Sequence, residues 1–547
     1  MVPFVNSALL GGYMTENRGD LDAVIVGAGF AGLYMLHRAR GLGLSAQVLE
    51  AGAGVGGTWY WNRYPGARCD VESMQYSYQF SDDLAQEWEW TERYAGQPEI
   101  LRYLEHVAHR FNLYPDIQFE TRVTAAVFDD TQGRWTVRTE GGGEYTAHYV
   151  IMATGCLSAT NTPAIAGAES FTGPTYHTGR WPHGGVDFTG LRVGVIGTGS
   201  SAVQSIPVIA QQARDLVVFQ RTATYSVPAW NGPIDPAEMA EIKANYGAFR
   251  AANSQNVTAI GERRPRTDRF ALAVTPEERR AEYEARWKDG GLPFLGAFAD
   301  LLFDPKANDT AAEFVRDQIR ATVHDPSTAA RLCPDQVIGC KRMCVDTGYY
   351  ATFNLPHVHL ADLRETPITS ITPGGIRTTA AEYELDAIVY ATGFDAMTGA
   401  LMRIDIRGKD GVTLQDAWAA GPRTYLGLGV VGFPNFFTIT GPGSPSVLTN
   451  MIVSIEQHVD WIADCVAYLG QHGYHRIEAT EEAQTAWVDY VNLVADFTLF
   501  PTCNSWYLGA NVPGKTRVFM PFLGFPPYAE KCTEVAANAY DGFELRR

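Results

Sequence analysis

The stretch Asp22-Ala-Val-Ile-Val-Gly27-Ala-Gly29-Phe-Ala-Gly32-Leu-Tyr-Met-Leu36 reads as a buried strand, a glycine turn and an amphipathic helix. Gly27 permits a tight turn, Gly29 lets the backbone approach a pyrophosphate, and Gly32 lets helix and strand pack closely. Free N–H groups at the helix N-terminus favour phosphate binding. The stretch therefore predicts a Rossmann-type dinucleotide-binding unit in an α/β fold.

The next strand and loop indicate which dinucleotide binds here. Ala46-Gln-Val-Leu-Glu50 is a short strand ending in an acid, which binds ribose hydroxyls and repels a 2′-phosphate, so the ligand is FAD or NAD. The loop from Gly56 to Asp70 is rich in glycine and aromatic residues, is not a regular helix or strand, and favours FAD because it can approach a flat isoalloxazine ring. Beside a buried cofactor, Asp70 would need a nearby cation. The alternative is a packed aromatic core loop with a surface acid.

A second fingerprint, Leu191-Arg-Val-Gly-Val-Ile-Gly197-Thr-Gly199-Ser-Ser-Ala202, follows later in the chain. Its second strand ends in Gln220-Arg221-Thr222 instead of an acid. A guanidinium and a hydroxyl suit a 2′-phosphate, so this unit is expected to bind NADP. Taken alone, Arg221 could equally be a solvated surface charge.

Between the two units lies Phe171-Thr-Gly-Pro-Thr-Tyr-His177-Thr-Gly-Arg-Trp181-Pro182. Its glycine, proline and aromatic residues predict a tight, well-packed linker that helps to set the relative position of the two units. His177 could carry a proton near neutral pH. On its residues alone, a buried linker histidine is the favoured interpretation.

Taken together, these motifs resemble the type I Baeyer–Villiger monooxygenases, over essentially the whole chain after the first twenty residues. The likeness is greatest to the branch with phenylacetone and steroid monooxygenases, through the runs that begin at Gly57, Gly421 and Ser505. Related N- and S-oxidising flavin monooxygenases share the first half of the linker run but lack its Trp-Pro ending. An N- or S-hydroxylating flavin monooxygenase is therefore the alternative function.

The resemblance implies an α/β fold with two Rossmann-like domains, for FAD and NADP, and a helical insertion in the NADP domain. The expected parts are an N-terminal extension 1–20, the FAD domain 21–156 and 395–547, the NADP domain 157–394 with linker 171–182, the helical insertion about 232–335, and a mobile loop about 492–512. The segment 523–528 departs from the family's Gly-Gly-Phe.

The implied reaction uses FAD and NADPH to insert one oxygen atom from O2 next to a ketone carbonyl, through a C4a-peroxyflavin, giving an ester or lactone. Sulfoxidation is also expected. Arg342, held by Asp70, is the expected positive charge for the peroxide and the developing oxyanion, and His177 is a further catalytic candidate. Without the family, Lys341-Arg342 would be an exposed basic turn. The family commonly has a small residue before this pair, where Cys340 stands here.

The remaining candidate residues divide into three groups. The FAD candidates are Gly27, Gly29, Phe30, Ala31, Gly32, Glu50, Gly57, Thr58, Trp59, Asp70, Tyr76 and Met451. The NADP candidates are Gly197, Thr198, Gly199, Ser200, Arg221, Thr222, Lys341, Arg342 and Trp506. The substrate-pocket candidates are Ser446, Val447, Leu448 and Met451.

The composition is that of an ordinary globular protein, with 46% hydrophobic and 19% charged residues. A net charge of −18 argues against nucleic acid or an anionic membrane surface as a partner. No apolar run is long enough to span a bilayer. The 8 cysteines show no zinc or C-x-x-C pattern, so we expect no metal, free thiols and a cytoplasmic location. We expect a monomer or weak homo-oligomer.

Overall fold

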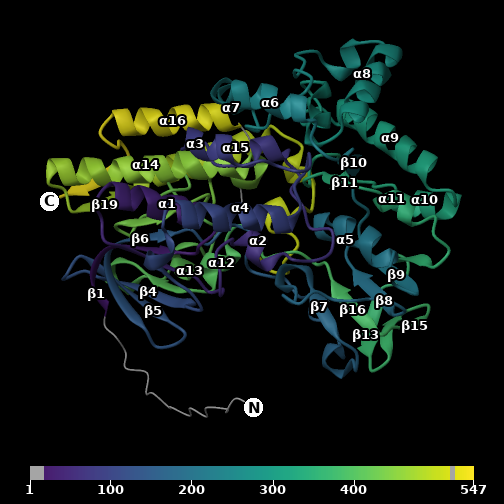
Figure 1. The fold of residues 1–547 in the computed structure, drawn as a ribbon, viewed down its shortest axis with the longest axis horizontal. Coiled ribbons are helices and arrows are strands. Elements are labelled where there is room, and N and C mark those ends of the chain that lie inside the picture. The colour runs from purple at the N-terminus through teal and green to yellow at the C-terminus, as the bar shows by residue number, and fades with distance from the viewer. Residues whose placement is uncertain (1–17, 516, 518–523) are drawn as a thin grey trace, which may run out of the picture.

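The computed structural model describes residues 18–515, 517 and 524–547, and two sheets dominate it (Figure 1). The larger sheet, on the left of the view, carries the first glycine turn, and the smaller sheet, at the lower right, carries the second. Most of the expected N-terminal extension lies outside the described residues, and β1 already begins at Arg18. Leu523, in the divergent tail, also lies outside them.

The larger sheet joins a parallel core to an antiparallel meander, in the order β17-β4-β5-β6-β1-β2-β3, with β18 paired to β6. Its strands are β1 Arg18–Val26, β2 Ala46–Leu49, β3 Ile117–Gln118, β4 Val123–Asp129, β5 Arg134–Thr139, β6 Glu144–Met152, β17 Asp405–Arg407 and β18 Phe436–Thr438. Strands β4, β5 and β6 form the meander, since β5 pairs antiparallel with both of its neighbours. Strand β6 pairs with β5 over 144–147 and continues beyond it in parallel pairing with β1 as far as Met152.

The first glycine turn has the geometry that its sequence predicts. Gly27 has φ +106°, in a region where side chains are rarely accommodated. A Cβ on Gly32 would lie 1.8 Å from the Gly27 carbonyl oxygen, so helix α1 (Phe30–Gly41) packs against the turn as closely as the backbone allows. A side chain at Gly32 is therefore incompatible with this fold.

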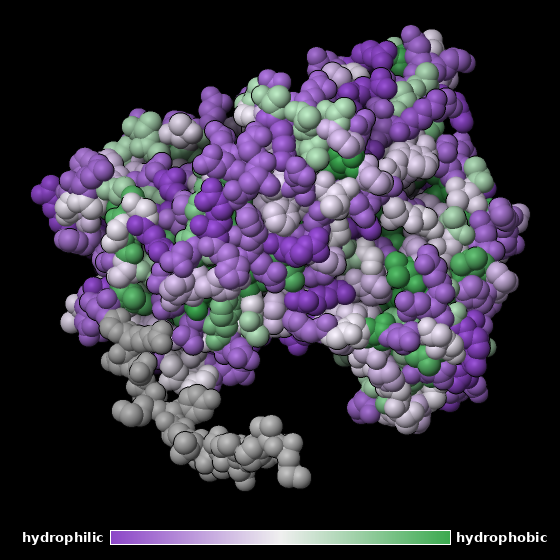
Figure 2. Space-filling model, viewed as in Figure 1, coloured by the Kyte–Doolittle hydropathy of each residue, from purple (hydrophilic) through white to green (hydrophobic). Residues whose placement is uncertain are grey.

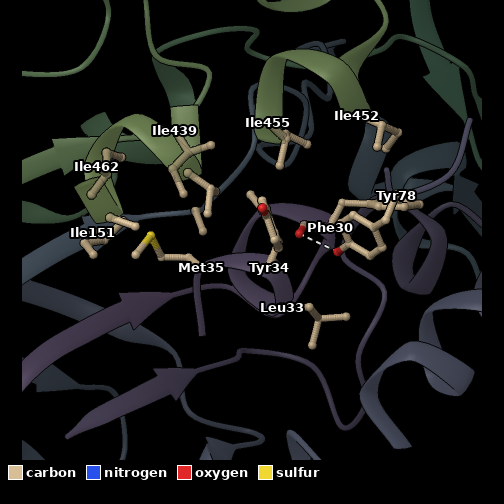
Figure 3. Close-up of a cluster of buried hydrophobic side chains, with 14 of the residues drawn as sticks. Phe30, Leu33, Tyr34, Met35, Tyr78, Ile151, Ile439, Ile452, Ile455 and Ile462 are labelled. Atoms are coloured by element: carbon tan, nitrogen blue, oxygen red, sulfur yellow. Dashed lines mark hydrogen bonds between the residues drawn. The ribbon is translucent and has the colours of Figure 1, made fainter. Parts of the chain in front are cut away.

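Helix α1 is buried on more than one face, so the predicted amphipathic pattern is wrong. The cause is helix α14 (Met451–His472), which covers the side of α1 away from the sheet (Figure 1). Figure 3 shows Tyr34 and Met35 of α1 among isoleucines of β6 and α14. The Tyr78 hydroxyl donates to the Phe30 carbonyl oxygen at 2.6 Å, which fixes the start of α1.

The smaller sheet is wholly parallel, in the order β12-β9-β8-β16-β7. Its strands are β7 Thr175–His177, β8 Arg192–Ile196, β9 Asp215–Gln220, β12 Val358–Asp362 and β16 Ala387–Tyr390. The linker thus supplies the edge strand β7. Trp181 is buried and its ring centroid lies 5.4 Å from that of Tyr176, as expected of a packed linker.

Helices and short strands complete the fold. The segment 56–70, for which no regular helix was expected, contains the single turn α2 (Thr58–Trp61), which follows two glycines at positive φ. The predicted helical stretch between Pro236 and Ala330 is confirmed as α6–α10 (Figure 1). The other helices and strands are α3 Asp82–Glu87, α4 Gln97–Arg110, α5 Ser200–Ala210, α6 Pro236–Ala244, α7 Tyr246–Ser254, α8 Pro276–Asp289, α9 Pro305–Thr322, α10 Pro326–Leu332, α11 Tyr349–Thr352, α12 Gly399–Met402, α13 Leu414–Ala417, α15 Glu481–Asp496, α16 Phe525–Ala537, β10 Ser226–Pro228, β11 Cys344–Asp346, β13 Ile368–Thr372, β14 Gly375–Thr378, β15 Glu382–Glu384, β19 Arg476–Ala479 and β20 Phe543–Arg546.

Figure 2 shows this face as largely hydrophilic and hollowed at its lower edge, between the two sheet-bearing units. Within the part of the chain that the structure describes, no helix combines the length and the apolar character needed to cross a bilayer.

The C-terminal helix α16 is joined to α14 by a buried hydrogen-bond chain. His458 Nδ1 accepts from the Thr440 N–H at 2.9 Å, and Nε2 lies 2.7 Å from the Tyr528 hydroxyl. That hydroxyl donates to the Leu426 carbonyl oxygen at 2.6 Å. The chain requires a neutral imidazole, and burial lowers the pKa of His458 to about 3.

This histidine is expected to make the fold acid-sensitive. As the pH falls below about 6.5, the unfolded chain takes up a proton at His458 while the folded protein does not, so the free energy of unfolding falls. Between about pH 6 and pH 4 the loss from this group is roughly 2 to 3 kcal/mol. Thermal unfolding midpoints measured against pH should therefore fall less steeply in His458→Gln. The exposed His472→Gln is the control, and equal slopes in all three proteins would contradict the prediction.

Candidate functional site

One cavity of about 2190 Å³ runs between the two sheets and is lined by both glycine turns. It reaches from Glu50 at the end of β2 to Arg221 after β9. The carboxyl ends of parallel strands form its floor, the usual place for ligands in doubly wound sheets. Because both glycine turns line this one cavity, two dinucleotides can lie in it together.

The part of the cavity next to the larger sheet fits FAD. Gly29 and Gly57 face each other so closely that a Cβ on Gly57 would lie 2.9 Å from the Gly29 Cα. Two backbones without side chains thus form a cradle at the start of α1, where a pyrophosphate can approach. Glu50 is buried, and its carboxylate accepts from the N–H groups of Ala28 and Gly52, each at 2.7 Å. These bonds fix the carboxylate at the end of β2, where the sequence predicts a contact with ribose.

The part next to the smaller sheet fits NADP. A Cβ on Gly199 would meet nothing within 4 Å, so the start of α5 opens onto free space. Thr198 Oγ1 donates to the Thr222 carbonyl oxygen at 2.6 Å and holds the turn against the end of β9. Arg221 and Lys341 line the same wall, and no carboxylate among the described residues forms an ion pair with either. Two cations without an ion-paired carboxylate give this wall the positive charge that a phosphate requires.

The centre of the cavity holds the predicted pair of Arg342 and Asp70. Arg342 Nε and Nη2 donate to the two Asp70 carboxylate oxygens at 2.5 and 2.9 Å. Nη1 donates to the Val447 carbonyl oxygen at 2.5 Å. Both side chains are mostly buried, with 18% and 23% of their surface exposed.

The Arg342 guanidinium remains charged in this setting. Burial opposes its charge, but the Asp70 carboxylate outweighs burial and raises the pKa of Arg342 above its ordinary value. A guanidinium has five N–H groups. The contacts above engage three of them, and the Tyr507 hydroxyl is a further hydrogen-bonding neighbour. Arg342 lines the cavity, so its positive charge is available to a negatively charged oxygen that binds there.

Most sequence-predicted candidates line this cavity, including Tyr76, Met451 and Trp506. His177 does not. Its Nδ1 accepts from the Gly179 N–H at 3.0 Å, and its Nε2 lies 3.3 Å from the Asn161 carbonyl oxygen. Burial lowers the pKa of His177, so the structure places it as a neutral linker residue outside the cavity lining.

Three other predicted residues also lie behind the wall. Gly32 contributes close packing rather than a ligand surface. Ser446 is fully buried at φ +45°, and its hydroxyl donates to the Thr440 carbonyl oxygen at 3.3 Å. Leu448 packs on the apolar cluster beside Val447.

Two contributors were missed by the sequence analysis. Gln204, on α5, accepts from the Tyr64 hydroxyl at 2.8 Å and donates to the Arg68 carbonyl oxygen at 3.1 Å, so it joins the NADP-side helix to the loop that carries Asp70. Tyr507 is buried against Arg342, next to the singled-out Trp506. A glutamine one turn into a helix carries no distinguishing sequence signal.

Comparison with known proteins gives a consistent result. Residues 24–274 match the family described as pyridine nucleotide-disulphide oxidoreductase. The chain is 43% identical over 535 residues to a Baeyer-Villiger monooxygenase of Pseudooceanicola batsensis, covering 96% of this chain and 97% of the relative. It is 42% identical over 535 residues to a phenazine N-monooxygenase of Lysobacter antibioticus, covering 97% and 98%.

The fold is also similar to that of a solved structure. An oxidized steroid monooxygenase bound to NADP superposes with a TM-score of 0.92 and 57% sequence identity, covering 96% of this chain and 100% of the other. The similarity therefore spans both sheets and the cavity between them.

Proposed function

The chain belongs to the FAD- and NADPH-dependent Baeyer–Villiger monooxygenases, and from this premise we propose that Arg342, held by Asp70, is the charge on which its ketone oxidation depends. The reaction inserts one oxygen atom from O2 next to a ketone carbonyl and gives an ester or lactone. The observation that carries the proposal is the bidentate Arg342–Asp70 contact at the centre of a cavity with two nucleotide cradles.

Bound FAD, once reduced by NADPH, supplies the activation of O2. The residues of this chain position the cofactors and the substrate, and they supply the electrostatic field at the reacting atoms. The positive charge of Arg342 stabilises negative charge that develops on oxygen, and Asp70 fixes the guanidinium plane so that no reorganisation is needed. Because the pair is mostly buried, the interaction acts in an environment of low dielectric, where it is stronger than in water.

The residues at the two strand ends indicate which nucleotide each cradle binds. Glu50 binds the ribose of FAD, and Arg221, Thr222 and Lys341 bind the 2′-phosphate end of NADPH. Trp506 contributes to the wall on the nicotinamide side. Holding both nucleotides in one cavity keeps water from the reacting centre.

A ketone fits the apolar wall beside Arg342. The residues of the apolar cluster there that line the cavity are Cys156, Ala396, Val447, Met451 and Trp506, and Met397, Phe500 and Tyr507 pack behind them. A pocket with one cation among apolar side chains favours a neutral substrate with a polarisable carbonyl over a charged one.

The test is a panel of cyclic, aryl, steroid and long aliphatic ketones, with NADPH consumption and product mass recorded together. We expect NADPH consumption coupled to products about 16 Da heavier than at least one ketone class. NADPH consumption with no oxygenated product from any ketone would overturn the proposal.

The alternative function is nitrogen oxidation, and the specific observation that favours it is the similarity to a phenazine N-monooxygenase. An aromatic N-heterocycle and a thioether belong in the same panel for this reason. An N-oxide as the sole product would assign the chain to nitrogen oxidation, and it would show that Trp181-Pro182 does not separate the two classes.

A further inference from the structure

Two cysteines that are far apart in sequence meet in the wall of the cavity. Cys340 directly precedes Lys341 and Arg342, and Cys503 lies three residues before Trp506. Both line the cavity, both are free thiols, and the two side chains are hydrogen-bonded to each other. We propose that Cys340 and Cys503 are a redox-active pair, which a peroxide converts to a disulfide that ties the Trp506 segment to the Arg342 segment.

The two thiols differ in the way that such a reaction needs. Cys340 is 1% exposed, whereas Cys503 is half-buried and reachable from the cavity. The hydrogen bond from Cys340 outweighs burial and, with a hydrogen bond from Thr502 and the charge of Lys341, lowers the pKa of Cys503 to about 7. All 8 cysteines lie within the described residues, and burial raises the pKa of each of the other six. Cys503 is therefore the attacking thiolate and Cys340 the resolving thiol.

The chemistry balances with hydrogen peroxide as the oxidant. The Cys503 thiolate attacks one peroxide oxygen, the O–O bond breaks, and hydroxide leaves a sulfenic acid on Cys503. The Cys340 sulfur then attacks that sulfur, the S–O bond breaks, and the thiol proton leaves with the hydroxyl as water. Both sulfurs are oxidised, and one peroxide is reduced to two waters overall.

The disulfide would fix a segment that walls the nucleotide cavity. Cys340 directly precedes Lys341, Cys503 lies three residues before Trp506, and both Lys341 and Trp506 line the cavity to which NADP is assigned. A covalent tie between them hinders the parting of the wall that nucleotide exchange requires. This consequence rests on the proposed function, whereas formation of the disulfide does not.

The experiment treats the FAD-loaded enzyme with a small excess of hydrogen peroxide, blocks the remaining thiols and digests the protein without reductant. We expect a cross-linked peptide containing residues 340 and 503, about 2 Da lighter than the sum of its parts. NADPH oxidation should fall by more than about half and return with dithiothreitol. Absence of the cross-link, or irreversible oxidation of Cys503 alone, would overturn the proposal.

Variants separate the pair from general oxidation. Cys503→Ser should give no cross-link. Its rate of NADPH oxidation after peroxide treatment should equal its rate before treatment. After peroxide treatment of Cys340→Ser, Cys503 should be found either as a thiol that reacts with the blocking reagent or in an over-oxidised form. Cys333→Ser, which changes a half-buried cysteine outside the cavity wall, should behave as the parent. An enzyme inactive with every substrate but still cross-linking would count against the proposed function and not against the pair.

Discussion

Replacing Arg342 by alanine is expected to abolish ester formation while leaving the reduction of FAD by NADPH intact. Reduction needs the two nucleotides in place, and these are held mainly by the glycine turns and strand ends. Oxygen insertion needs a fixed cation, and the structure puts the Arg342 guanidinium, held by Asp70 and the Val447 carbonyl oxygen, in the cavity. Loss of such a donor set lowers the rate by at least about 10²-fold.

The measurement is stopped-flow reduction under anaerobic conditions beside product yield in air. Arg93→Ala is a matched control, because Arg93 and Glu72 form an ion pair with 16% and 23% of their side chains exposed, close to the exposure of the Arg342 pair, and Arg93 does not line the cavity. Arg342→Lys keeps the charge but loses the bidentate contact, and should retain part of the yield. Ester formation at the parental rate in Arg342→Ala would refute the assignment.

Local sequence patterns predicted those parts of the fold that local physics determines. The turns at Gly27 and Gly197 have positive φ, a local backbone property that the glycine motif predicts. The close packing against the carbonyl oxygens of Ala153 and Ala391, which leaves no room for a Cβ, is a contact between distant parts of the chain. The length of β6 was not predictable in this way. Its continuation depends on β5 and β1 pairing along its two edges, and a turn signal cannot report that.

In the site, too, local sequence predicted single residues but not the contacts between distant ones. Asp70 was predicted to need a cation, but its partner lies 272 residues away, and only the family resemblance indicated which one. Cys340 was visible as a departure from the family pattern. Its contact with Cys503 comes from the packing of two loops, and no spacing rule connects positions so far apart.

Replacing Arg221 by alanine is expected to remove most of the preference for NADPH over NADH. Arg221 follows β9 where an acid would accept a ribose hydroxyl, and it lines the cavity beside Lys341. Charge-assisted bonds to a 2′-phosphate correspond to about 10–100-fold in the ratio of kcat/KM values. Arg364 lines the same cavity, but its charge is already satisfied by Asp335 at 2.9 Å and Asp362 at 3.2 Å. Arg364→Ala should therefore leave the ratio unchanged, and a ratio that is the same in Arg221→Ala as in the parent would place the phosphate site elsewhere.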